Sequence, residues 1–314
     1  MSPPLPTLSG LTFSIVGPGA VGESLSAWLI ARGAVLHQAS GRPGSARLAS
    51  FARRFAVPAV ALDSLATEGE NLLLLAVPDA ALEDVANRLA ARPQAAVVVE
   101  VSGVADPSIL APLRGRGSAI GGLHPLRAFP AAEPRVESAA GQFFALGGDP
   151  AAIALGRRLA AALGGTSAVV TAEQRPLYHL VASLMAGGVT TVVAAATEIA
   201  AAAGLSAEVR AGFSTLALDA LRQALGADDP ARGITGPAAR GDQETLLREL
   251  AALDAVNGAA ISVVVALARE TLRQRARLAA ADPAQEALRQ LLDRADLLDL
   301  AKDRVLTSKG KPSG

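Results

Sequence analysis

A glycine-rich motif near the start of the chain constrains the fold more than any other sequence feature. The residues Gly17-Pro18-Gly19-Ala20-Val21-Gly22 have the pattern G-x-G-x-x-G, between an apolar run at residues 11–17 and a helical pattern at residues 20–32. A strand, a tight glycine turn and a helix in this order open a βαβ unit. The motif therefore predicts a sheet of parallel strands with this turn at its carboxyl edge.

The alternation of strand and helix continues over the first half of the chain. Residues 71–77 are apolar on both faces, as expected for a central parallel strand. Further strands are predicted at 35–39, 96–101 and 118–124, with candidate extensions at 142–147 and 167–170, and helices at 45–55, 80–91, 108–113 and 151–163. This order predicts an α/β fold with a doubly wound parallel Rossmann sheet.

Strand signals stop near Glu173, after which the chain is helical. Helices are predicted at 176–203, 206–225, 243–253, 255–280 and 283–302. We therefore expect two domains, a Rossmann domain at residues 1–172 and an all-α domain at residues 173–314.

The composition excludes several function classes. Hydrophobic residues make up 51% of the chain and charged residues 18%, which is typical of a folded globular protein. Basic and acidic residues number 29 each, so no net charge favours nucleic acid or an anionic membrane. The absence of cysteine excludes disulfides, thiolate catalysis and iron–sulfur clusters, and no metal-ligand spacing is found. With a start at residues 1–9 that lacks the order of a signal peptide, we expect a cytoplasmic protein without a metal site.

One uncharged stretch, residues 180–197, is just long enough to span a bilayer. It carries Ser183, Gly187 and several threonines among small alanines, and no second stretch resembles a span. A buried helix of the helical domain is therefore favoured over a transmembrane helix. Together with residues 255–267, it is expected to pack into a shared helical core that also supports a homodimer.

The glycine motif predicts a dinucleotide site. Gly17 would allow the tight turn, Gly19 would let the backbone approach a pyrophosphate, and Gly22 would permit close packing of helix and strand. The amino terminus of the following helix would face the phosphate charge. The alternative is a glycine-rich turn that binds no ligand.

The end of the second strand indicates which dinucleotide is bound. NAD sites usually place an acid there, to bind the ribose hydroxyls. Here the residues are Ala39-Ser40-Gly41-Arg42, with Arg47 following and no carboxylate before Asp63. A hydroxyl beside a guanidinium suits a 2′-phosphate, so NADP is the expected cofactor. The alternative is that Arg42 is a solvated loop residue.

Hydride transfer needs a proton donor or acceptor, and the chain offers three histidines and one tyrosine. His37 lies on the second strand and is interpreted as structural. His124 ends a strand at its carboxyl edge, where open α/β sheets bind ligands. Tyr178 and His179 open the first helix after the domain junction, and pockets are common between domains.

Several short motifs resemble, in their order, those of one protein family. They are Gly17 to Gly22, Val77-Pro78-Asp79, Ser102-Gly103, Leu123-His124-Pro125-Leu126, Tyr178-His179, Thr235-Gly236-Pro237 and Arg240-Gly241-Asp242. The chain resembles two-domain proteins that pair a Rossmann-like domain with a helical domain of unknown function. These are similar to pyrroline-5-carboxylate reductase and to deazaflavin-dependent NADP reductases. The resemblance covers nearly the whole chain.

The resemblance implies an NADP-dependent oxidoreductase of a small molecule, with a helical domain like the C-terminal domain of 6-phosphogluconate dehydrogenase. That domain would bind substrate and form a homodimer. Pro78, Ser102 and Gly103 would lie beside the nicotinamide, and Val77 would also bind the cofactor. Tyr178, Thr235, Gly236 and Arg240 would contact the substrate. Alternatively, Arg240 pairs with Asp242 in a structural turn.

His124 and His179 are then the candidate catalytic acid and base. We expect them to meet across a cleft between the domains, also walled by Pro78, Ser102 and Thr235, with pKa values near neutrality. The alternative for His124, which precedes a proline, is that it only caps its strand.

Two residues depart from the family pattern. Glu100 stands where His or Thr is expected before Ser-Gly, and Gly188 stands where relatives tend to have Asn on the long helix. Either the polar contact comes from elsewhere, or this chain has changed or lost its chemistry.

Three functions therefore remain open. The first is an NADP(H)-dependent oxidoreductase that transfers hydride to or from a small C=O or C=N substrate. The second is a dehydrogenase of the prephenate type, since Gly122-Leu123-His124-Pro125 resembles its G-x-H-P segment. The third is an NADP-binding sensor or scaffold without turnover.

Overall fold

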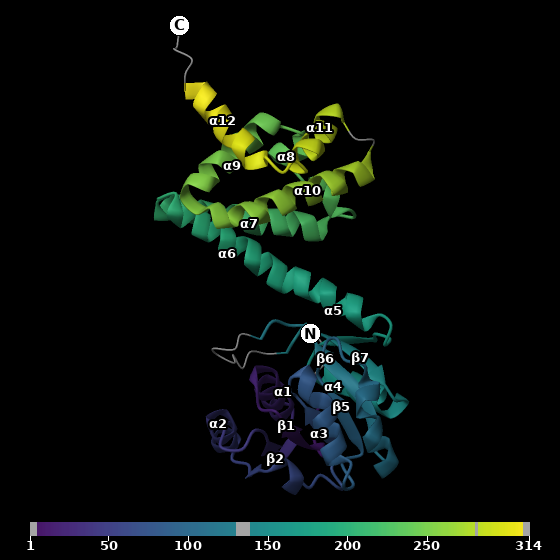
Figure 1. Cartoon of the computed structure of the whole chain (residues 1–314). Helices are drawn as coiled ribbons and strands as arrows, with labels where there is room; N and C mark the ends of the chain where they lie inside the picture. The colour runs from purple at the N-terminus through teal and green to yellow at the C-terminus, as the bar shows by residue number, and fades with distance from the viewer. Residues whose placement is uncertain (1–4, 130–138, 280–281, 310–314) are drawn as a thin grey trace. The chain divides into compact units, whose positions relative to one another are not determined.

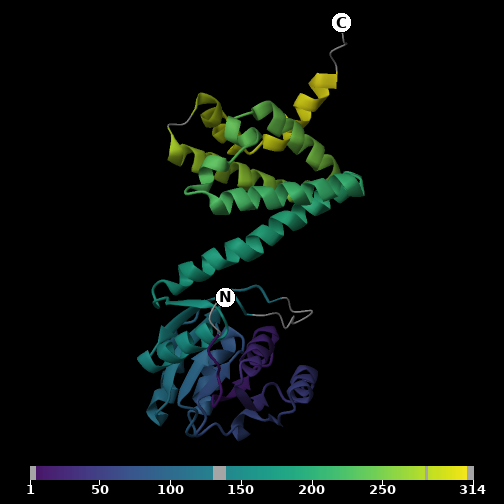
Figure 2. The ribbon, with the colours of Figure 1, turned by 180° about the vertical axis from the view of Figure 1, so that it is seen from behind.

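The computed structural model describes residues 5–129, 139–279 and 282–309, in two compact units, Met1–Ala186 and Gly187–Gly314 (Figures 1 and 2). The expected boundary at 172/173 falls earlier than this division. Helix α5(Arg175–Ser183) belongs to the first unit, in which the side chain of Arg175 is only 1% exposed. The first unit therefore extends beyond its last strand, because it also includes the helix α5, which is anchored on the sheet by Arg175.

The first unit is built on an eight-stranded sheet of order β3-β2-β1-β4-β5-β6-β7-β8. The strands are β1(Thr12–Val16), β2(Val35–Ser40), β3(Ala59–Val60), β4(Leu72–Leu75), β5(Val97–Glu100), β6(Ala119–Pro125), β7(Phe143–Gly148) and β8(Thr166–Val169). All neighbouring pairs are parallel except β6 and β7. The order reverses direction between β1 and β4, as in a Rossmann sheet, which confirms the predicted α/β class.

Helices cover both faces of this sheet. One hydrophobic core joins it to α1(Ala20–Ala31), α2(Ala46–Phe55) and α4(Pro150–Ala162). A second core joins it to α3(Leu82–Leu89) and the 3-10 helix η3(Pro107–Arg116). The sheet is thus doubly wound, as the sequence predicts.

The second unit consists of helices, as predicted (Figure 1). They are α6(Val189–Ala202), α7(Ala207–Gly226), α8(Pro237–Arg240), α9(Gln243–Asn257), α10(Ile261–Leu278), α11(Pro283–Leu292) and α12(Leu297–Lys309). The core lies among α9, α10, α11 and α12, with Leu250, Leu272 and Leu288 at its centre. The break between the helices predicted at 243–253 and 255–280 lies a few residues later than expected, at the 3-10 turn Gly258–Ala260, so that α9 ends at Asn257 and α10 begins at Ile261.

The expectation that residues 180–197 are buried is wrong for the single chain. Leu180, Leu184 and Val193 are each about half exposed or more, whereas Ala260 and Ile261 do join the core. By length and composition alone, two helical stretches could cross a membrane, Arg175–Ala202 and Gln243–Leu278. The apolar composition of residues 180–197 indicates that this helix is covered by another apolar surface, but it does not show whether that surface belongs to the same chain.

Candidate dinucleotide-binding site

The glycine turn has the geometry that its motif predicts. Gly17 has a φ of +90°, and a Cβ there would lie 2.7 Å from the carbonyl carbon of Ala76. A Cβ on Gly22 would lie 2.8 Å from Cδ1 of Ile15, so this glycine allows α1 to pack on β1. Around Gly19, in contrast, a Cβ would meet nothing within 4 Å. Gly17 and Gly22 therefore pack against the protein, whereas the space beside Gly19 is free for a ligand.

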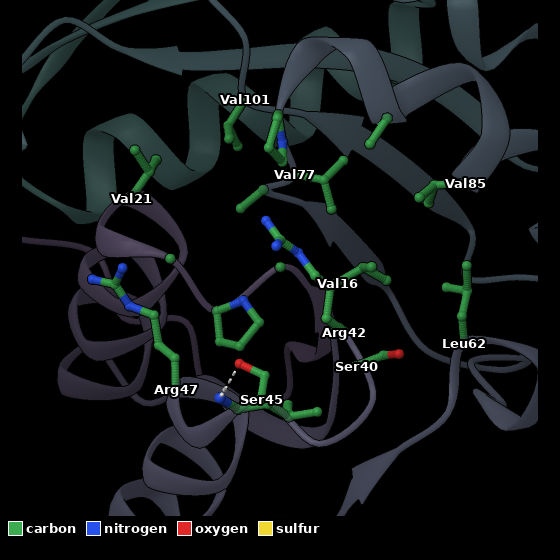
Figure 3. Close-up of a pocket in the computed structure, with 18 of the residues that line it drawn as sticks. Val16, Val21, Ser40, Arg42, Ser45, Arg47, Leu62, Val77, Val85 and Val101 are labelled. Atoms are coloured by element: carbon green, nitrogen blue, oxygen red, sulfur yellow. Dashed lines mark hydrogen bonds between the residues drawn. The ribbon is translucent and has the colours of Figure 1, made fainter. Parts of the chain in front are cut away.

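A cavity of about 1080 Å³ opens beside this turn, at the carboxyl edge of the sheet. Its apolar walls come from several strand ends and from α1 and α3, and Figure 3 shows Val16, Val21, Val77 and Val101 around it. Its lining includes the predicted cofactor residues Gly17, Pro18, Gly19, Ala20, Val21, Ser40, Arg42, Val77, Pro78 and Ser102, but not Gly22 or Gly103.

Two arginines and a serine line the end of the cavity next to β2. Arg42 extends into the middle of the cavity, and Arg47 and Ser45 lie beside it at the start of α2 (Figure 3). Ser45 caps this helix, since its hydroxyl accepts from the Leu48 N–H at 3.4 Å. Ser40 is fully buried, and its hydroxyl points away from Arg42. Of the two residues predicted to hold a 2′-phosphate, Arg42 therefore has the better placement.

The carboxylate that lines this end of the cavity is already engaged. Asp63 accepts hydrogen bonds from Nε and Nη2 of Arg88, with a shortest distance of 2.9 Å. This contact with Arg88 lowers the pKa of Asp63. Asp63 is thus neutralised by its partner, unlike an acid that accepts from ribose hydroxyls.

These residues fit a dinucleotide. The open turn at Gly19 and the uncapped amino terminus of α1 present backbone N–H groups, which suit a pyrophosphate. The cavity is large enough for a cofactor of this size.

Next to the cavity, β5 ends on a buried, hydrogen-bonded pair of Glu100 and Arg175. Glu100 is fully buried, and its carboxylate accepts from the Ser102 N–H at 2.5 Å and from Nη1 of Arg175 at 3.1 Å. Nη1 of Arg175 also donates to the carbonyl oxygens of Ser102 and Ala105, at 3.2 and 2.8 Å. The pair therefore ties the first residue of α5 to the loop after β5.

Burial raises the pKa of Glu100 to about 8, against the opposing effects of Arg175 and the Ser102 N–H. A Cβ on Gly122 would collide with both Glu100 and Arg175, so this pair requires glycine there. This explains the glycine of the G-x-H-P segment by packing, without a prephenate-type site.

The two predicted catalytic histidines lie together in the first unit. Nδ1 of His124 lies 2.8 Å from the Tyr178 hydroxyl. A Cβ on Gly103 would lie 3.0 Å from Nε2 of His124 and 2.6 Å from Cδ2 of His179. Both imidazoles thus face Gly103, next to Ser102 in the cavity wall, although neither histidine lines the cavity itself.

The expectation of a near-neutral pKa is wrong for His124. Burial lowers the pKa of His124 to about 4, and the charges of His179 and Arg175 act in the same direction. The sequence places His124 at a strand end but does not show how deeply the residue is buried. His124 is therefore neutral at pH 7.

The predicted residues of the second unit surround a short helix. Gly236, with a φ of +102°, caps α8, and Thr235 and Arg240 are exposed. Asp242 caps α9 by accepting from the Thr245 N–H at 3.0 Å. Thr235, Gly236 and Arg240 stay predictions as substrate residues.

Arg175 was not among the predicted site residues, and Glu100 was predicted only as a departure from the family pattern. A signal was present, because a charge that ends an apolar strand needs a buried partner. No local pattern in the sequence indicates that this partner is Arg175, which is 75 positions further along the chain.

Comparisons with known proteins agree with this architecture. A Rossmann-like domain model matches residues 7–125, and a model described as a domain of unknown function, DUF2520, matches residues 142–271. No curated protein matches the sequence significantly.

Among solved structures, three similar ones cover most of the chain. A Bacteroides fragilis protein provisionally assigned as an NADP oxidoreductase is 18% identical, with a TM-score of 0.70 over 83% of this chain and 97% of its own. The Myxococcus stipitatus imine reductase in complex with NADP+ is 17% identical, with a TM-score of 0.59 over 88% and 98%. A Coxiella burnetii pyrroline-5-carboxylate reductase is 19% identical, with a TM-score of 0.50 over 82% and 97%.

At these identities the likeness shows the fold. Together with the two domain models, it identifies the chain as a protein of the two-domain architecture in which a DUF2520 helical domain follows a Rossmann-like domain.

Proposed function

We propose that this protein is an NADP(H)-dependent oxidoreductase that acts on a small C=O or C=N substrate. The observation that carries the proposal is the cavity at the glycine turn, in which Arg42 and Arg47 replace the acid of an NAD site. Two guanidiniums suit the charge of a 2′-phosphate, and the open turn at Gly19 suits the pyrophosphate.

The bound cofactor would supply or accept a hydride, and the protein would position the substrate and move a proton. Pro78 and Ser102 line the cavity at the ends of β4 and β5, so the nicotinamide would lie against them. His124 lies next to Gly103, which supports it as the group that would exchange a proton with a substrate at that end. His179 is the second candidate there, since its ring faces the same glycine.

A homodimer is part of the proposal. All of α7 lacks buried residues, and Val209, Phe213 and Leu216, which share one face, are about half exposed or more. Charged residues such as Arg210 and Asp219 interrupt its apolar positions, which suits a protein partner better than lipid. A second copy would bury the same face on both subunits.

Turnover tests the oxidoreductase proposal. NADPH oxidation would be followed with a panel of cyclic imines, ketones and aldehydes, and NADP+ reduction with 2-hydroxy acids and amines. We expect consumption of NADPH with at least one C=O or C=N compound. Tight NADPH binding without turnover across the panel would support the sensor instead, and release of carbon dioxide from prephenate would support the prephenate-type reaction.

A further inference from the structure

The hydrogen bond between His124 and Tyr178 is the contact from which we infer a mechanism. Nδ1 and the phenol oxygen are 2.8 Å apart, and the two rings meet edge to face, with centroids 5.6 Å apart and planes at 90°. His124 belongs to β6 and Tyr178 to α5, and the two residues are 54 positions apart in the sequence. Tyr178 is the only tyrosine of the chain.

The chemistry of the two groups favours the phenol as donor. A phenol oxygen is a weak acceptor because its lone pair is delocalised into the ring, whereas an unprotonated imidazole nitrogen is a strong one. Burial raises the pKa of Tyr178, so its hydroxyl carries its proton at pH 7 before any reaction begins. If Tyr178 donates to Nδ1, the neutral ring of His124 carries its own proton on Nε2.

Nε2 is the nitrogen of His124 next to Gly103, the residue that follows Ser102 of the cavity wall. It lies 3.0 Å from the position of a Cβ on Gly103, and Ser102, the preceding residue, lines the cavity. The charged or titratable groups that act on His124 are His179 and Arg175 of α5 and Asp79, which follows β4. None of them is the partner of Nδ1.

We propose that Tyr178 and His124 form a relay of two protons in the reducing direction. The bound cofactor would supply hydride to the C=O or C=N carbon, and the substrate oxygen or nitrogen would take its proton from Nε2. In the same step Nδ1 takes the proton of the Tyr178 hydroxyl. His124 changes tautomer and stays neutral, and Tyr178 becomes a phenolate. This inference rests on the proposed oxidoreductase function.

The relay explains how a partly buried, neutral histidine can deliver a proton. With a pKa of about 4, only about one His124 in a thousand would be an imidazolium at pH 7, so the ring has no second proton to give. Tyr178 supplies that proton, and because its side chain is only half buried, water can restore it.

Histidine NMR on the complete protein tests the relay without cofactor or substrate, so its result is independent of the proposed function. With [15N]histidine, His37→Gln and His179→Gln variants would assign the three rings. At pH 7 we expect His124 to be neutral, with Nε2 protonated and Nδ1 bare, and Tyr178→Phe to yield a mixture of tautomers. A proton on Nδ1, or an imidazolium at pH 7, would overturn the relay.

A proton inventory provides the kinetic test once the panel yields a substrate. In mixtures of H2O and D2O, the wild-type kcat should curve with the deuterium fraction, because two protons move together. Tyr178→Phe should lower kcat by roughly 10²-fold, leave the NADPH Kd unchanged and make the dependence linear. A linear inventory in the wild type would contradict the relay.

Discussion

Arg42 is the residue on which the cofactor preference depends most, because its guanidinium extends into the cavity. We expect Arg42→Ala to weaken NADPH binding by roughly 1.5–3 kcal/mol, the range of a charged hydrogen bond, and to leave NADH nearly unchanged. Calorimetric titration with both cofactors measures this. Arg53→Ala, an exposed position of α2 outside the cavity, is the control for lost charge. Equal losses for both cofactors would contradict the assignment.

Glu100 should make stability depend on pH. Its pKa is about 8 in the folded protein and near 4.5 in the unfolded chain. Between pH 4.5 and pH 8, Glu100 is therefore protonated in the folded state and ionised in the unfolded state. The free energy of unfolding should therefore fall as the pH rises from about 4.5 to 8.

Urea unfolding across this range would measure the pH dependence. Glu100→Gln cannot titrate and should flatten the decline, whereas Glu83→Gln, at an exposed position of α3, should not. An unchanged slope in Glu100→Gln would show that the carboxyl is ionised throughout the range.

At the scale of single residues, local chemistry was predictable and long-range partners were not. The roles of Gly17, Gly19 and Gly22 follow from their spacing, and the structure has the geometry for each. The sequence also placed Arg42 correctly at the end of β2. The partner of Glu100, by contrast, depends on how α5 packs against β5, which no local pattern encodes.

At the scale of elements, the loop after β5 packs closely against β6 and α5. A Cβ on Gly103 would lie 2.6 Å from the His179 ring and 3.0 Å from Nε2 of His124. Gly103→Ala should therefore lower the free energy of unfolding by about 1–3 kcal/mol and shift the His124 resonances. Gly115→Ala, where a Cβ meets nothing within 4 Å, should do neither. If Gly103→Ala changed neither the free energy of unfolding nor the His124 resonances, the close packing of this loop would be contradicted.

The type and order of most elements could be predicted, because periodicity and glycine turns act locally. The direction of β7 could not, since an apolar run looks the same in a parallel and an antiparallel strand. β7 pairs antiparallel with β6, with Gly121 opposite Gly148. The two-residue strand β3 was missed because it is too short for a pattern.

On the scale of the whole molecule, the exposed apolar face of α7 predicts self-association. Light scattering at micromolar concentration should give the mass of a dimer. Leu216→Glu, which puts a charge on a side chain that is 65% exposed, should yield monomers. Gln223→Glu adds the same charge at a polar position of α7 and should leave the dimer intact. A wild-type protein that is cleanly monomeric would remove this part of the proposal.

The affinity of the unmodified protein for NADPH and NADH tests the central claim most directly. If Arg42 and Arg47 hold a 2′-phosphate, NADPH should bind at least about tenfold more tightly, a difference of about 1.4 kcal/mol. At about 100 times its Kd, NADPH should also stabilise the fold by roughly 2.7 kcal/mol. Equal affinities, tighter binding of NADH, or binding of neither would contradict an NADP(H) site at this glycine turn.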